Sequence, residues 1–245
     1  MPEAFAVDFP GHRSAKAVRV DSMDDLPGAL AALGLSSRPT LVLVGGADRL
    51  TADDLERLHG LFSDTVAPLV EELGAQVIDG ATDAGVMRLI GRARQEQQLA
   101  FPLIGVAALG NVAVPGDPSG LDGVDLEPNH SHFVLVAGEG WGRESPWIAR
   151  LASTLADGEA SATLVVNGGE ISWTDLSESI AQDRPIVAVA GSGGTADAVA
   201  SHMDGMRTDS RAEPLESSGL LVATDPAASG TSVRAALERL LGAGA

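Results

Sequence analysis

The chain has 245 residues and a formal net charge of −18 at pH 7, from 16 Lys and Arg against 34 Asp and Glu. This length suffices for one α/β domain with a full core, and the negative charge opposes a phosphate backbone, so we expect no nucleic-acid partner. The absence of cysteine excludes disulfides, a thiolate nucleophile and a cysteine-based zinc site.

Short apolar runs rich in β-branched residues alternate along the chain with stretches of helical period, which predicts eight buried parallel strands. The predicted strands are Ala17–Val20, Leu41–Val44, Gln76–Asp79, Leu103–Ala107, Phe133–Val136, Leu164–Val166, Ile186–Ala190 and Leu220–Val222. This alternation implies right-handed crossovers, and hence an α/β fold with an open, mostly parallel sheet and helices on both faces. We treat residues 1–245 as a single domain.

The helical segments carry start and stop signals. Asp24 can cap the first helix, and Gly34 would end it. A long segment opens at Thr51 and contains Pro68, which we expect to kink or interrupt it. The final helix is predicted over Thr231–Leu241.

One helix shows a clear buried stripe, in which apolar residues recur at i, i+3, i+4 and i+7. The stripe is Val86, Leu89, Ile90 and Ala93. Two segments lack such a period. Leu109–Asn129 is rich in glycine and proline and is expected to form a loop over the site, whereas the polar Met206–Ser218 is expected to be a surface connection.

The N-terminal stretch MPEAFAVDFPGHRSAK lacks the basic-then-apolar order of a signal peptide. The sequence also contains no run of 18 apolar residues. We therefore expect a cytoplasmic protein with no membrane partner.

Four of the predicted strands end in a glycine-rich turn that leads into a helix. The turns read LVLVGGAD, QVIDGATDAG, TLVVNGGEI and VAVAGSGGTAD. Parallel strands end on one edge of the sheet, so these turns should converge where such folds bind ligands. Free backbone N–H groups at helix starts can bind oxygen atoms without a cationic side chain, and glycine permits a close approach. The pattern predicts a site for a phosphate or diphosphate with attached ribose.

Each turn also has a purely structural interpretation, as a tight connection. GSGGT is not a P-loop, because Thr195 is followed by Ala196 and the lysine is missing. In DGATDAG, Asp79 and Asp83 disfavour a phosphate and favour ribose hydroxyls. Asp83 or Thr82 can equally cap the helix that follows.

The stretch LEPNHSHFVLV places His130 and His132 two residues apart at the start of a strand, where they could be metal ligands or a general base. No third ligand supports a metal, so we expect none, and we favour a role for Asn129 and His130 in fixing the loop. Arg143 and Arg150 are the candidates to neutralise a bound anion, with surface salt bridges as the alternative.

Five stretches occur in the order and approximate spacing of a known family. They are VIDGATDAGVMRLIGRA, PLIGVAALGNV, LEPNHSHFVLV, LVVNGGEISWTDL and PIVAVAGSGGTADAVA. The chain resembles the cytosolic N-terminal nucleotide-sensing domain of TRPM (melastatin-type) ion channels, and within the SLOG superfamily it is similar to the free-standing bacterial LSDAT proteins. The resemblance covers about residues 41–203.

The resemblance implies a Rossmann-like domain that binds a nucleotide-derived ligand such as ADP-ribose, with no obligatory cofactor and with self-association into a homo-oligomer. The turns and the resemblance together predict these ligand-binding residues: Gly45, Gly46, Gly80, Thr82, Asp83, Ala84, Gly85, Val86, Asn129, His130, Arg143, Gly168, Gly169, Glu170, Gly191, Ser192, Gly193, Gly194 and Thr195.

The chain departs from its relatives at several positions. The channels tend to carry an arginine where this chain has Gly194, and the related phosphoribohydrolases carry a proline where this chain has Ala190 and a catalytic glutamate that this turn lacks. The low aromatic content and the missing catalytic carboxylate favour a ligand sensor. The alternative is a hydrolase of N-glycosidic bonds in nucleotides or nucleosides, with Glu170, Asp83 or His130 as acid or base, although Glu170 can equally cap its helix.

Overall fold

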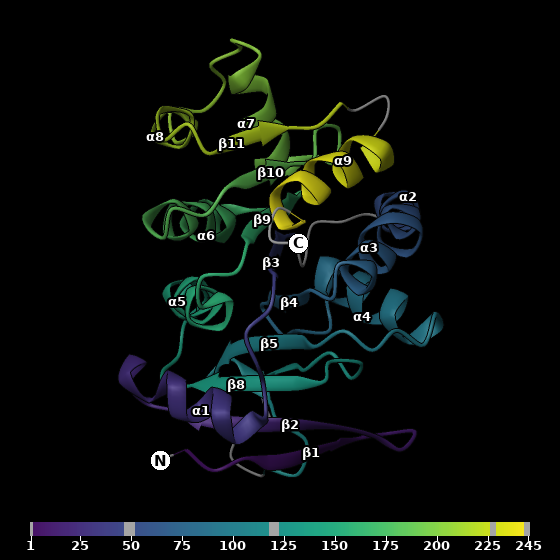
Figure 1. Ribbon diagram of the computed structural model, residues 1–245, viewed down its shortest axis with the longest axis vertical. Helices are drawn as coiled ribbons and strands as arrows, with labels where there is room; N and C mark the ends of the chain where they lie inside the picture. The colour runs from purple at the N-terminus through teal and green to yellow at the C-terminus, as the bar shows by residue number, and fades with distance from the viewer. Residues whose placement is uncertain (1, 47–51, 118–122, 226–228, 243–245) are drawn as a thin grey trace.

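The computed structural model describes residues 2–46, 52–117, 123–225 and 229–242. Nine strands form one sheet in the order β1-β2-β8-β5-β4-β3-β9-β10-β11, with β1 antiparallel to β2 and the other neighbours parallel. Figure 1 shows them stacked from β1 near the bottom to β11 near the top. The strands are β1 Phe5–Phe9, β2 Arg13–Val20, β3 Thr40–Gly45, β4 Gln76–Asp79, β5 Leu103–Ala108, β8 His132–Val136, β9 Ser161–Val166, β10 Ile186–Ala188 and β11 Leu221–Ala223. A separate small ladder joins β6 Val112–Ala113 to β7 Val124–Asp125.

All eight predicted strands are present, and the predicted α/β fold with a mostly parallel sheet is confirmed. The prediction for β4 matches residue for residue. Strand β2 begins at Arg13 rather than Ala17, and β10 ends at Ala188 rather than Ala190.

The edge strand β1 is not among the predicted strands. It forms an antiparallel hairpin with β2, and the turn between them uses Gly11 and His12 at φ angles of 82° and 61°. The sequence FAVDFPG does contain a signal for this strand. Side chains along FAVDF alternate between the core and the solvent, and the Pro-Gly dipeptide that follows marks a turn. A search for continuous apolar runs overlooks such a half-exposed strand.

Helices cover both faces of the sheet, as expected (Figure 1). One face packs against α1 Leu26–Leu33, α5 Ser145–Ala156, α6 Glu170–Ala181, α7 Gly194–Met203 and α8 Ala212–Ser217. The other face packs against α2 Ala52–Leu61, α3 Ala67–Glu72, α4 Gly85–Glu96 and α9 Ser229–Leu241. Aliphatic side chains dominate both cores, and the predicted stripe of α4 is entirely buried.

Proline interrupts the long helical segment, as predicted. The stretch Phe62–Val66 between α2 and α3 is a π-helical turn, in which the Ala67 N–H bonds to the Phe62 carbonyl. It lies just before Pro68, which has no N–H to donate. The predicted start at Thr51 lies outside the described residues.

Two predictions about helix ends and connections are wrong. Asp24 is not the N-cap, because the Ser22 hydroxyl accepts from the Asp24 N–H and a short 3-10 turn precedes α1. Gly34 does end α1, at a φ of 75°. The connection Met206–Ser218 contains the helix α8, whose apolar side chains Ala212 and Leu215 are buried.

The glycine-rich segment Leu109–Asn129 lies on the sheet rather than over the predicted site. Its apolar residues, including Leu126, join a third core cluster with side chains of β1, β2, β5 and β8. Residues 118–122 lie outside the described residues. Near its end, the Glu127 N–H donates to the Ala81 carbonyl at 2.8 Å, so this segment supports the turn after β4.

Candidate functional site

The strand order reverses between β3 and β9. From β3 the chain builds β4, β5 and β8 on one side, and it then returns to place β9, β10 and β11 on the other. Ligands in open α/β sheets bind at the carboxyl ends of the strands at such a reversal. The four predicted glycine turns follow β4, β3, β9 and β10, which are consecutive neighbours in the sheet. The predicted convergence of these turns is confirmed.

A cavity of about 210 Å³ opens between the turns after β3 and β9. We call this cavity the glycine cradle. Its lining consists of Gly45, Gly46, Gly168, Gly169 and the first residues of α6, Glu170, Ile171 and Ser172. An adjoining cavity of about 100 Å³, here the inner pocket, shares Gly45, Ile171 and Ser172 with the cradle. The two cavities therefore lie next to each other, and we refer to them together as the crevice.

The start of α6 presents backbone N–H groups to the cradle. Gly169 is its N-cap residue, with an extended backbone at φ −123°, and the Gly169 N–H donates to the Ser172 hydroxyl at 3.2 Å. The amides of Glu170 and Ile171 have no helix carbonyl one turn earlier to bond to. A Cβ atom at Gly169 would meet no atom within 4 Å, so the cradle is open there.

In the turn after β10, part of the predicted site is bonded within the protein. The first amides of α7 are already bonded, because Thr195 N–H donates to the Gly168 carbonyl at 3.2 Å and Ala196 N–H donates to the Asn167 carbonyl at 2.8 Å. The Ser192 hydroxyl accepts from the Asn167 N–H at 2.8 Å. Ser192 and Thr195 thus hold the β9 turn in shape, and α7 does not offer the amides of Thr195 and Ala196 to a ligand.

The turn after β4 contributes Gly80 and Thr82 to the inner pocket. Neither Thr82 nor Asp83 caps α4, because the N-cap is Ala84 and no side chain caps this helix. Asp83 instead pairs with Arg88, at 2.7 Å between a carboxylate oxygen and Nε. Of the other predicted residues here, Gly85 has a positive φ of 45°, and the Val86 N–H donates to the Gly46 carbonyl at 3.2 Å.

The predicted histidine motif is a buried structural network. His130 is fully buried, with Nε2 2.8 Å from the Asp79 carboxylate and Nδ1 2.8 Å from the Glu127 carboxylate. Asn129 donates to Glu127 at 2.5 Å and accepts from Arg13 at 2.9 Å. Burial lowers the pKa of His130, but the carboxylates of Asp79 and Glu127 outweigh it and raise this pKa to about 9. This geometry matches the loop-fixing role and leaves His130 with no nitrogen for a ligand.

The cations near the crevice are only partly those predicted. Arg143 lines an open hollow beside Trp141 and donates to the Glu139 carbonyl at 3.4 Å, whereas Arg150 is exposed on α5. Sequence reasoning missed Arg211, whose guanidinium lies 2.6 Å from the Glu170 carboxylate. Glu170 is therefore an exposed ion-pair partner at the first position of α6 and not its cap.

Sequence reasoning also missed the carboxylates of the inner pocket. Glu144 and Asp175 line this cavity together with Trp141, which is 54% exposed at its mouth. Burial raises the pKa of Asp175 to about 7; the Ser145 hydroxyl lowers it, and the nearby carboxylates of Glu144 and Glu178 raise it. Perturbed carboxyl groups in a cleft are a general mark of functional sites.

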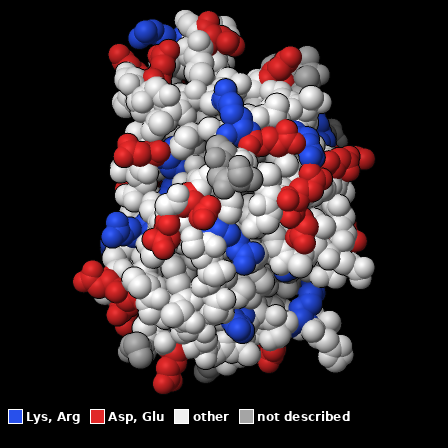
Figure 2. Space-filling model, in the orientation of Figure 1, with Lys and Arg blue, Asp and Glu red and all other residues white. Residues whose placement is uncertain are grey.

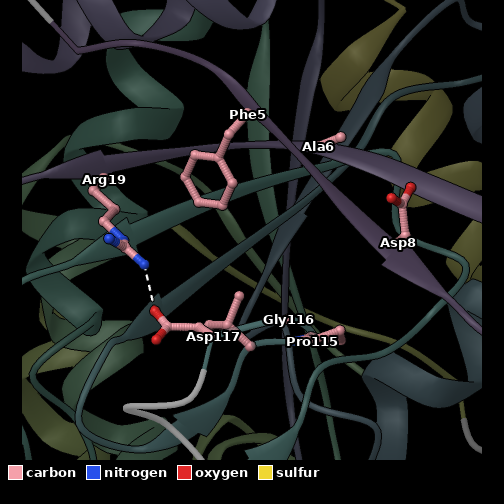
Figure 3. A pocket seen from close by; sticks show the side chains of 8 residues that line it. Phe5, Ala6, Asp8, Arg19, Pro115, Gly116 and Asp117 are labelled. Carbon is pink, nitrogen blue, oxygen red and sulfur yellow. Dashed lines mark hydrogen bonds and ion pairs between the residues drawn. The ribbon is translucent and has the colours of Figure 1, made fainter.

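A larger and more open cavity of about 420 Å³ lies away from the glycine turns, against β1 and β2 (Figure 3). The Arg19 guanidinium lies over the Phe5 ring and pairs with Asp117. Among the described residues that line this cavity, Arg19 is the only cation; it is already paired, and Asp8 adds a further negative charge that disfavours an anion. The crevice at the strand reversal is therefore the better candidate site.

Both the sequence and the fold have relatives among known proteins. Residues 38–233 match the family model described as SLOG in TRPM, prokaryote. A curated relative, the transient receptor potential cation channel subfamily M member-like 2 of Nematostella vectensis, is 30% identical over 201 residues. The match covers 66% of this chain and 13% of the relative, so the chain spans only a small part of that channel's length. In the described part of the chain, no helix has the length and apolar character needed to cross a membrane.

Two solved structures share the fold. The X-ray structure of TM1055 has a TM-score of 0.54 and 16% identity, covering 82% of this chain and 99% of that one. The molybdenum cofactor carrier protein of Chlamydomonas reinhardtii has a TM-score of 0.52 and 16% identity, covering 84% of this chain and 99% of that one. The family match and the Rossmann-like fold together indicate a nucleotide-related domain. Because the family model matches most of its length, the chain belongs to the prokaryotic branch of the SLOG in TRPM family.

Proposed function

We propose that this chain binds a nucleotide-derived ligand, of the ADP-ribose or a related type, in the crevice between the turns after β3 and β9. The observation that carries this proposal is the glycine cradle, an open cavity at the strand reversal with the amide end of α6 on its wall. Family membership supports the same ligand class. A helix N-terminus can bind an anion through its backbone amides alone, and neighbouring glycines let the anion come close to the main chain.

In this proposal the phosphates lie in the cradle and the nucleoside extends toward the inner pocket. The two cavities share Gly45, Ile171 and Ser172, so one ligand can occupy both. Trp141 lies at the mouth of the inner pocket, where its exposed ring offers a stacking face to a base. The ligand thus makes backbone contacts at one end and side-chain contacts at the other.

The side chains favour ligand binding without hydrolysis. Each acid or base considered for hydrolysis is engaged elsewhere. Glu170 pairs with Arg211 and Asp83 with Arg88, and His130 is buried between two carboxylates. A general base must reach the proton it removes. Asp83 and His130 line neither cavity of the crevice, and Glu170, which lines the cradle, is paired with Arg211. We therefore propose a ligand sensor.

Nucleic acid is a poor candidate for the ligand. The net charge of −18 repels a phosphate backbone. Figure 2 shows acidic and basic side chains interspersed on the face in view, with no continuous basic stripe. A small nucleotide held by backbone amides avoids this electrostatic cost, because its phosphates contact one helix end rather than a long surface.

The proposal is tested by calorimetric titration with NAD, ADP-ribose, AMP and cyclic nucleotides, followed by chromatography of each ligand after incubation. We expect saturable binding of at least one of them, with every ligand recovered intact. Release of a free base or of ribose 5-phosphate would instead establish the hydrolase. The absence of binding across the panel would refute a nucleotide site.

A further inference from the structure

The inner pocket contains two carboxylate oxygens that have no donor. Glu144 is only 8% exposed, and its Oε1 accepts from the Gly142 N–H at 3.1 Å. Its Oε2 and the Oδ1 atom of Asp175 are buried without a hydrogen-bond partner, and so is the hydroxyl of Ser145, which lies close enough to Asp175 to lower its pKa. Both residues line the inner pocket. Burying a carboxylate oxygen without a hydrogen-bond donor costs free energy. Two such oxygens on residues that line one cavity therefore indicate a bound group that supplies the donors.

The missing partner must donate hydrogen bonds and must not be an anion. An ionised carboxylate only accepts, which holds for Asp175 above its pKa of about 7, and two acids that share a small cavity repel a phosphate once they are ionised. The same cavity meets the glycine cradle at Ser172 and Gly45, where the proposed function places phosphate. The group that adjoins a phosphate in any nucleotide is ribose, whose hydroxyls are neutral donors.

We propose that Glu144 and Asp175 bind the hydroxyl groups of the ligand's ribose, with the phosphates in the glycine cradle; this assignment rests on the proposed nucleotide site. The crevice then selects ribonucleotides over deoxyribonucleotides and over nucleotides phosphorylated on these hydroxyls. Glu144 is the N-cap residue of α5 and Asp175 lies in α6, and these two helices pack side by side on one face of the sheet. Selectivity therefore comes from side chains, whereas phosphate binding comes from the backbone.

The test compares ADP, 2′-deoxy-ADP, IDP and inorganic pyrophosphate by calorimetric titration. The proteins are wild type, Glu144→Gln, Asp175→Asn and the control Glu159→Gln, which removes an equal charge from an exposed position beyond the end of α5. On wild type and control, we expect 2′-deoxy-ADP to bind about 10- to 100-fold more weakly than ADP, because it lacks a hydroxyl that would donate a hydrogen bond to a charged carboxylate. In Glu144→Gln and Asp175→Asn, ADP should weaken and the ratio of the two affinities should approach one, while pyrophosphate binds as in wild type.

The outcomes separate the two proposals. Equal affinity of wild type for ADP and 2′-deoxy-ADP overturns the ribose assignment and leaves nucleotide binding standing. Loss of affinity for IDP but not for 2′-deoxy-ADP also overturns it, because the carboxylates then contact the amino group of the base. If neither the nucleotides nor pyrophosphate bind to any of the proteins, the proposed function itself is wrong.

Discussion

The exchange Asp175→Asn should make the unliganded protein more stable at neutral and alkaline pH. Burial in the inner pocket raises the pKa of this carboxyl from 3.8 to about 7. Between these values the native protein holds a proton that the unfolded chain has already lost. The free energy of unfolding therefore falls as the pH rises through this window, and above it the penalty is fully present.

The magnitude follows from the two pKa values. One pKa unit corresponds to about 1.4 kcal/mol, so a rise from 3.8 to about 7 gives a penalty of about 4 kcal/mol above pH 7. The amide of the variant has nearly the same shape and cannot ionise, so the variant escapes this penalty. For a chain of this length, the gain corresponds to a rise in Tm of about 10 °C at pH 8.

The assay is urea denaturation of wild type, Asp175→Asn and the Glu159→Gln control across the window from acid to pH 8. The variant should gain stability relative to wild type progressively, from almost nothing near pH 4 to its maximum near pH 8. The control should track wild type throughout. A variant that is no more stable than wild type at pH 8 would show that the carboxyl is not held in a costly environment, and would remove a main reason to place a ligand there.

Three further predictions concern the cradle, the histidine network and the mouth of the crevice. Gly169→Leu extends a side chain from an extended backbone into open space, so ADP affinity should fall more than about 10-fold. Its Tm should fall by only a few degrees, because Leu is a poorer N-cap residue than Gly. Gly60→Ala in α2 should leave affinity unchanged in the same titration. The raised pKa of His130 contributes about 3 kcal/mol to the free energy of unfolding, which is fully present below pH 6.5 and lost as the pH rises through about 9. His130→Gln should therefore be less stable in urea denaturation, and its free energy of unfolding should not fall with pH in this window. An unchanged pH dependence in the variant would contradict the buried pairing. Trp141→Ala should weaken ADP binding about 2- to 10-fold with unchanged Tm, and equal affinity in calorimetry would exclude stacking on this ring.

Most of the fold could be predicted because buried parallel strands leave a strong local signal. The run Gln76–Asp79 is flanked by turn residues and consists of side chains that are buried in the sheet, and it matches β4 without error. The edge strand β1 lacked this signal, since only alternate residues are buried. The strand order could not be predicted, because it depends on which neighbours pair after the chain crosses over.

The site was predictable in its backbone and not in its side chains. Gly45, Gly46, Gly168 and Gly169 do converge, as the shared edge of parallel strands requires. In the turn after β10, the bonding of Thr195 and Ala196 could not be predicted, because the partners of their amides are carbonyls of another turn. A side chain at Gly193 would itself strain the backbone, since φ is 94° and a Cβ would lie 2.7 Å from the side-chain nitrogen Nδ2 of Asn167.

Glu144 and Asp175 were missed for a related reason. Each lies on or beside a helix, where a carboxylate is usually exposed to solvent, and they are far apart in the sequence. Only the packing of α5 against α6 brings both into one cavity. A signal was present in WGRESPW, where an acid stands directly at a helix start next to glycines and an aromatic residue.

The central claim is that backbone amides at the start of α6 bind the anionic part of the ligand. It is tested most directly by amide chemical-shift mapping of the full chain during titration with inorganic pyrophosphate. The account predicts the largest shifts at the amides of Gly169, Glu170 and Ile171, with those of Thr195 and Ala196 nearly unmoved because they are already bonded. Shifts concentrated at the start of α7, or at the distant cavity beside Arg19, would contradict it.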